Sequence, residues 1–377
     1  MAERIYFSFM FRVIIILIAF VLFGKTGLSV ENYILYHKKI VLAEEEIFLK
    51  DKVHKGLLIY ADVFEKFDFV FLQDCIIAMQ LSLYIKDEVL FLKFADKAIK
   101  NGLLLRHFAL LKYIATHPIY IKNEYKIKKH FQQNRSTYLK RIDTATLKKV
   151  ISLYSYDQMD KIKIANETDK QYYSRYKPFI QETTYKLMKL IHDKGFLGDR
   201  LIGIDQNDIL KELHLGNYDA IDYYIKHKND PGFHAVQLQF GFDEHYFSST
   251  IYFPIIIHFV NSWKQHSDRC RYIVHTDSFY REQIAKGNMH PQELANLYDL
   301  GFNFVTTPKP DTTKGEKYFG IQLVFSTKDR PDSILDAGMN HFRTTYNIST
   351  IQCQRAKVDF LRKHRMHYSF GYLGCRS

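Results

Sequence analysis

The sequence predicts a mainly α-helical protein of the α+β class, in which a membrane or signal helix precedes a helical cap and a mostly helical carboxy-terminal domain. Three observations predict this class: an apolar amino terminus, helix-type hydrophobic patterns from residue 30 to about residue 120, and one pair of β-rich segments. We divide the 377 residues into a signal peptide or signal anchor (1–29), a helical, tetratricopeptide-like domain (30–145) and a mostly helical domain with a β-hairpin at about 300–326 (146–377).

The composition is that of a folded globular protein. Hydrophobic residues make up 47% and charged residues 25%, which excludes a disordered chain and a polytopic membrane protein. Four cysteines are too few for a scaffold held together by disulfides. Aromatic residues reach 15% with a single Trp, so Tyr and Phe must fill the cores. The net charge is +12.

The amino-terminal segment has the length and apolarity of a membrane helix. Ile5–Gly24 is apolar except for Ser8 and Arg12, and Val13–Phe23 contains no polar side chain. The run Val13–Phe23 spans about 16 Å of helix, about half of a bilayer's hydrocarbon core, whereas a helix starting at Ile5 would cross that core. A run that is apolar on all sides favours a membrane segment over the buried first helix of a cytosolic domain.

The charges near this segment predict that the bulk of the chain is extracytoplasmic. Arg4 and Arg12 precede the apolar run, and the positive-inside rule places such a start in the cytoplasm. Gly27-Leu28-Ser29 fits the small-x-small pattern of a cleavage site. A secreted chain with a cleaved signal peptide and a membrane-anchored chain both remain open, and either one is periplasmic.

Residues 30–145 carry the hydrophobic pattern of a helical domain. Phe69–Asp87 is too apolar for a surface helix and predicts a core helix. Glu88–Lys100 predicts a second helix with Asn101-Gly102 as its C-cap, and the apolar segment after it must end before Pro118. This helix pair, which ends in AxKAIxNG, resembles a tetratricopeptide unit. Because a solenoid needs about three repeats or more and the unit appears once, a helical cap is favoured over a peptide-binding concave face.

Residues 121–150 form a basic zone. An anionic membrane surface or an acidic envelope polymer fits this charge, and a solvated helix face is the alternative. Nucleic acid is disfavoured, because an exported chain does not routinely meet it and no nucleic-acid motif accompanies the zone. The zone sets two acids, Glu124 and Asp143, against nine basic residues: Lys122, Lys126, Lys128, Lys129, Arg135, Lys140, Arg141, Lys148 and Lys149.

Six short motifs between residues 145 and 363 follow one another in a recognisable order and spacing. They are Asp157-Gln158, Gly195-Phe196 with Gly203-Ile204, Gln265-His266-Ser267-Asp268, Leu297-Tyr298-Asp299, Phe319-Gly320-Ile321-Gln322, and Phe342-Arg343 with Asn347. Together they resemble a bacterial family catalogued as a domain of unknown function, with DQxxR, QHxD, LYDR and YGTQ motifs.

The chain departs from this family pattern at several positions. Lys161 and Leu300 stand where the family has arginine, and the loss of the second arginine removes a bidentate cation beside Asp299. Asn347 stands where the family has glycine, a mild change because Asn tolerates the left-handed conformation that follows a helix.

The resemblance brings together residue types that acid–base or polar-recognition sites use. His266 would act as a general base and Asp299 would orient it. No nucleophile elbow, phosphate loop or HExxH motif occurs, and His258 lies eight residues from His266 rather than the four of a helical metal pair. We therefore assign no cofactor and no metal ligand. The candidate ligand-binding residues are Asp157, Gln158, Asp268, Gln322 and Arg343.

Residues 300–326 have the pattern most typical of strands. Residues 300–307 and 318–326 are β-rich and flank the turn-rich sequence PKPDTTKGEK, which predicts a hairpin with a long loop. Much of the remaining domain is predicted helical, with Pro291 at the start of one helix.

Three functions remain open. The sequence favours a non-catalytic interaction protein of the envelope, binding an envelope or extracellular protein or polymer. A hydrolase that uses His266 as general base is the first alternative. A sensor of a metal ion or another small ligand is the second.

Overall fold

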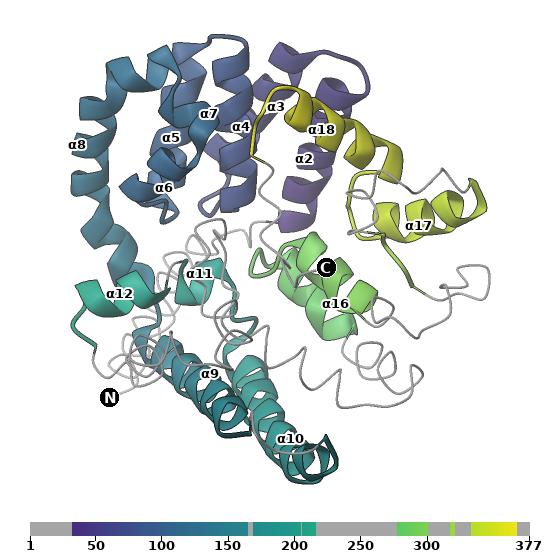
Figure 1. The fold of residues 1–377 in the computed structure, drawn as a ribbon. Coiled ribbons are helices and arrows are strands. Elements are labelled where there is room, and N and C mark those ends of the chain that lie inside the picture. The colour runs from purple at the N-terminus through teal and green to yellow at the C-terminus, as the bar shows by residue number, and fades with distance from the viewer. Residues whose placement is uncertain are drawn as a thin grey trace, which may run out of the picture.

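A computed structural model describes residues 32–164, 169–204, 206–215, 277–300, 317–320 and 333–367. Every regular element in these ranges is a helix, which confirms a mainly α-helical protein (Figure 1). A further helix covers 277–285. The other helices are α2 (Tyr33–Phe48), α3 (Val53–Lys66), α4 (Leu72–Tyr84), α5 (Glu88–Lys100), α6 (Leu105–Leu110), α7 (Lys112–Ala115), α8 (Pro118–Arg141), α9 (Thr144–Ile164), α10 (Asp169–Lys194), α11 (Asp199–Ile202), α12 (Gln206–Glu212), α16 (Pro291–Leu300), α17 (Ser333–Thr345) and α18 (Ile351–Lys363).

The first hydrophobic core is built by consecutive helices that pack in pairs, α2 on α3 and α4 on α5. Helix α5 has the expected bounds, and Asn101 is its C-cap. Gly102 follows with φ +110°, and a Cβ there would lie 2.5 Å from the Tyr138 ring, so only glycine fits this close turn. The next apolar segment is broken into α6 and α7, and the predicted stop is confirmed: the His117 side chain caps α8, and Pro118 is its first residue.

The second core lies around α9, α10, the 277–285 helix and α16. Helices α9 and α10 pack side by side and form the lower part of the molecule in Figure 1. The aromatic rings of Tyr280, Tyr298 and Phe319 fill this core, each at most 2% exposed. Tyr and Phe thus fill the interior of a chain with one Trp, as the composition predicts.

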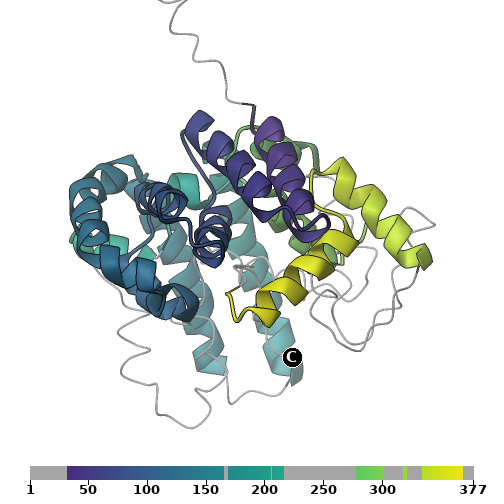
Figure 2. The same ribbon diagram turned by 90° about the horizontal axis from the view of Figure 1, so that it is seen from above.

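The carboxy-terminal helix returns to the first core. Helix α18 packs on α2 (Figures 1 and 2), and Leu361 and Met366 are buried among the amino-terminal helices. The Gln80 side chain donates to the His367 carbonyl at 2.7 Å and accepts from the His367 N–H at 2.6 Å. The two ends of the described chain therefore stabilise each other.

Several expectations concern residues outside the described ranges. The apolar segment Ile5–Gly24 is one of them, and within the described ranges no helix combines the length and apolarity needed to cross a bilayer. Most of the expected hairpin is another. Leu300 ends helix α16 instead of opening a strand, and residues 317–320 have no regular structure. The hairpin stays a prediction for the rest of 300–326.

Asn347 closes helix α17 in the left-handed conformation that the sequence suggests, with φ 58°. The Ile348 N–H then donates to the Arg343 carbonyl at 2.8 Å, a bond that crosses the helix end as in a Schellman motif. The turn directs Ile348 into the second core and leads the chain to α18.

Replacing Asn347 by alanine should lower the free energy of unfolding by about 1 kcal/mol, because alanine is strained in the left-handed conformation. Asn347→Gly should stay within about a few tenths of a kcal/mol of the parent, since glycine adopts this conformation without strain. Urea denaturation measures both variants. Equal losses for alanine and glycine would contradict a conformational role.

Candidate functional site

Two of the residues suggested by the sequence, Asp299 and Arg343, meet at one backbone segment. The Asp299 carboxylate accepts the Phe319 N–H at 2.7 Å, and Arg343 Nη1 donates to the Phe319 carbonyl at 2.6 Å. Arg343 Nε also donates to the Ser349 carbonyl at 2.6 Å. Asp299 and Arg343 are 1% and 0% exposed. Both side chains therefore hold the main chain of residue 319 inside the second core.

Burial lowers the pKa of Arg343 to about 10, while the nearby Asp299 charge acts in the opposite direction. The guanidinium accordingly stays charged at neutral pH and satisfies carbonyls that would otherwise be buried without a partner. This environment is that of a residue holding the fold, with its donors occupied by the protein itself.

The remaining suggested residues are not brought together by the described structure. Asp157 and Gln158 lie on helix α9, and nothing is described of their side chains. His266, Asp268 and Gln322 lie outside the described residues. An acid–base pair of His266 and Asp299 therefore stays a prediction.

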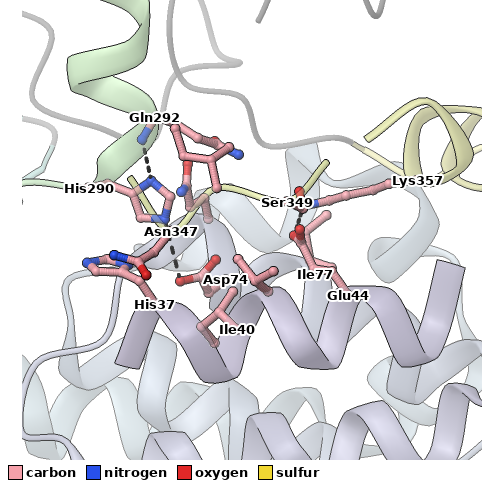
Figure 3. A pocket seen from close by; sticks show the side chains of 13 residues that line it. His37, Ile40, Glu44, Asp74, Ile77, His290, Gln292, Asn347, Ser349 and Lys357 are labelled. Carbon is pink, nitrogen blue, oxygen red and sulfur yellow. Dashed lines mark hydrogen bonds and ion pairs between the residues drawn. The ribbon is translucent and has the colours of Figure 1, made fainter. Parts of the chain in front are cut away.

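A different polar cluster lines a cavity where the first and the last described helices meet (Figure 3). The cavity lies between α2, α4, the start of α16, the turn after α17 and α18. Its volume is about 20 Å³, enough for about one water molecule. Its polar lining consists of His37, Glu44, Gln73, Asp74, His290, Gln292, Asn347, Ser349 and Lys357.

His290 lies in this cluster, and its ring is held in place because it caps the start of helix α16. Its Nδ1 accepts the Gln292 N–H at 3.2 Å, and Glu293 accepts the His290 N–H at 2.8 Å, so residues 290–293 form a reciprocal cap. Since Nδ1 accepts, the ring hydrogen resides on Nε2, which lies 4.0 Å from Asp74 Oδ2. Figure 3 shows the His290 ring between Gln292 and Asp74.

Asp74 and His37 complete the inner side of the cavity. The Tyr36 hydroxyl donates to Asp74 at 2.7 Å, and the His37 ring meets the His290 ring edge-to-face at 5.2 Å. His37 is 1% exposed, and its Nε2 has no hydrogen-bond partner among the described residues. The cavity therefore contains a buried polar atom suited to a water molecule or another small polar ligand.

Burial sets the protonation of these groups. It lowers the pKa of His37 to about 3 and also lowers that of His290, where the His37 ring adds to the effect. Burial raises the pKa of Asp74 to about 7, against the opposing effect of the Tyr36 hydrogen bond. Both imidazoles are thus neutral at neutral pH, and Asp74 is the group that titrates there.

Glu44 and Lys357 form the other wall of the cavity as a direct ion pair, and each side chain is 5% exposed. Removing Lys357 would leave the buried carboxylate of Glu44 without this cation, which costs about 3–5 kcal/mol in comparable pairs. The pair therefore joins α2 to α18 across 313 residues of sequence.

The sequence contained weak signals for this cluster. Asp74 is a charged residue in the apolar stretch Phe69–Asp87, so a core position required a polar partner. His290 precedes Pro291 and a glutamate three residues on, a capping pattern. Nothing in the sequence placed His37 or Lys357 beside them. In the described ranges no three His, Cys, Asp or Glu side chains are arranged to hold a metal ion.

Comparison of the chain with protein families, with curated proteins and with solved structures found no match. The resemblance of residues 145–363 to a family of unknown function therefore stays an expectation.

Acidification should destabilise the protein through the buried histidines. Between pH 6.5 and about 3 the unfolded chain takes up a proton at His37 that the folded chain does not, so the free energy of unfolding falls as pH falls. His290 acts in the same direction and Asp74 in the opposite one. Between pH 6.5 and 4 the free energy of unfolding of His37→Phe should fall less steeply than that of the parent. The difference in slope should be at most about 1.4 kcal/mol per pH unit. Urea unfolding across this range measures it, and parallel pH profiles for the two proteins would contradict the assignment.

Proposed function

We propose that the protein is an extracytoplasmic binding protein, membrane-anchored or secreted, rather than an enzyme. The observation that carries the proposal is that the buried charged side chains near the cavity and in the second core are all occupied by internal contacts. Asp299, Arg343, Glu44 and Lys357 all bind groups of the protein itself, and the cavity beside them has room for about one water molecule. Side chains committed in this way favour a scaffold that binds through its surface. The partner would be an envelope or extracellular protein or polymer.

The basic zone supports an anionic partner. Of its nine basic residues, Arg135 is buried on α8 and donates to both carboxylate oxygens of Glu212, at 2.7 and 2.9 Å. The other eight are exposed. Lys126 and Lys129 have no ion-pair partner among the described residues. This surface suits an anionic membrane or an acidic polymer. The pairwise packing of α2 with α3 and of α4 with α5 supports a tetratricopeptide-like domain over residues 30–145.

A small-ligand sensor is the second candidate, and one observation favours it. His37 lines the cavity, and its buried Nε2 has no hydrogen-bond partner among the described residues. A ligand bound there would contact both ends of the described chain. A ligand that binds only the folded state raises the melting temperature. An unchanged melting temperature across small polar ligands and metal ions would remove this candidate.

The location is tested by fusing the full chain to a reporter that is active only outside the cytoplasm. The expected result is an active reporter, in a membrane pellet if the segment Ile5–Gly24 anchors the chain or in a processed soluble form if it is cleaved. A matched chain without residues 1–29 should remain inactive. An unprocessed, inactive fusion in the cytoplasm would overturn the proposed location.

The anionic partner is tested with polyglutamate and the detergent-solubilised full chain. Binding should weaken as salt is added, and Lys126→Glu/Lys129→Glu should bind several-fold more weakly at low salt, because two exposed cations on α8 are reversed. Lys186→Glu/Lys189→Glu on α10 is the matched control with the same charge change. Equal weakening in both double variants, or binding that ignores salt, would exclude a specific role for the zone.

A further inference from the structure

Within the part of the chain that the structure describes, neither core covers one side of helix α2. The helix lies between α3 and α18 (Figure 1), and its remaining side presents Leu35, Leu42 and Leu49, which are 50%, 44% and 49% exposed. These leucines recur every seven residues, and each step of seven rotates by about 20° around a helix. All three therefore lie within an arc of about 40°.

Two charged residues share this side. Lys38 and Glu45 also recur at a spacing of seven. Lys38 is exposed and Glu45 is half-buried, and neither lies within ion-pair distance of an opposite charge among the described residues, although the charge of Glu45 acts on Lys50. Neighbouring charges on the same helix are paired within the chain. Those pairs are Lys39 with Asp62, Glu46 with Lys50 and Lys55, and Glu44 with Lys357. We call the set Leu35, Lys38, Leu42, Glu45 and Leu49 the α2 face.

The α2 face is complementary to itself when reversed. Leu35 and Leu49 lie at equal distances on either side of Leu42. Lys38 precedes Leu42 by about 6 Å along the axis and Glu45 follows it by about 4.5 Å, so the two differ by about one residue's rise. A second α2 placed antiparallel would set Leu42 against Leu42, Leu35 against Leu49, and Lys38 against Glu45. In a parallel copy Lys38 and Glu45 would lie at different heights and on opposite sides of the interface, so they could not pair.

We propose that the α2 face binds a second copy of this chain, with the two α2 helices antiparallel about a two-fold axis at Leu42. Such an interface is isologous, so every contact occurs twice. The leucines provide the apolar centre, and the two Lys38–Glu45 pairs select the antiparallel orientation. Lys39 and Glu46 pair with Asp62 and Lys55 of helix α3 and border the face on that side. The inference goes beyond the proposed function and holds for an anchored or a secreted chain.

A second copy fits this surface better than an anionic bilayer does. The negative headgroups of such a bilayer would repel Glu45. They would pair with Lys38 but would supply no cation for Glu45. A copy of the same helix satisfies both charges and all three leucines at once. The α2 face is therefore best matched by a second copy of the same chain.

Cysteine cross-linking of the full chain tests the geometry. In a background with Cys270 and Cys375 changed to Ser, Leu42→Cys should link to itself on mild oxidation, since it lies on the axis. Leu35→Cys alone should not link, but a mixture of Leu35→Cys and Leu49→Cys should give a mixed dimer. Val89→Cys, on a residue that is 77% exposed on α5, is the control that should stay monomeric. Self-linking of Leu35→Cys without the mixed dimer would overturn the antiparallel arrangement.

Charge exchange tests the same interface in solution. Lys38→Glu should raise the dimer dissociation constant about tenfold in sedimentation, because the introduced carboxylate would then face Glu45 of the second copy twice. Lys38→Glu/Glu45→Lys should restore the parent value. Unchanged thermal unfolding shows that these surface variants fold. A parent chain that sediments as a monomer at every concentration, or a double variant as weak as the single one, would overturn the proposal. Quenching of a Leu42→Trp/Trp263→Phe variant by brominated lipids would also overturn the proposal, because it would assign the α2 face to a bilayer.

Discussion

The buried Glu44–Lys357 ion pair joins the first described helix, α2, to the last one, α18. We call the contact of α2 and α4 with α16 and α18 around this pair the polar junction, and its geometry depends on the pair. A charge removed from water needs a partner of opposite sign within contact distance. Helices α2 and α18 must therefore come together at one register, with Glu44 facing Lys357. Packing of Phe48 against Phe360 and burial of Leu361 follow from that register. The ion pair thus selects one arrangement among the many that apolar surfaces alone would permit.

The same junction shows how one fold treats buried polar groups in two ways. Glu44 and Lys357 are brought together as a salt bridge, whereas His37 and His290 are kept neutral, because burial lowers the pKa of each imidazole. Asp74 lies between these two cases, with a pKa raised to about 7 and a tyrosine hydroxyl donating to it. A polar interior of this kind specifies geometry through hydrogen bonds, since each group has only a few acceptable partners.

The sequence predicts the local features of the fold well and its long-range contacts poorly. Helix α5, its Asn101 cap, the stop before Pro118 and the left-handed Asn347 all follow from interactions within a few residues. The polar junction does not, because Lys357 and Glu44 meet only in the folded chain. Arg135 illustrates the same limit. Its neighbours in sequence suggest an exposed cation, and its burial depends on Glu212, 77 residues away.

The return of α18 to the amino-terminal helices has a consequence for the order of events during synthesis. Helix α2 emerges early, but Lys357 and His367, which bind Glu44 and Gln80, emerge about 300 residues later. Contacts between such distant residues form slowly, because a long loop must close first. The first core therefore lacks part of its cover until translation has passed α18. Until then the amino-terminal helices expose to solvent the apolar surface that α18 covers in the folded chain.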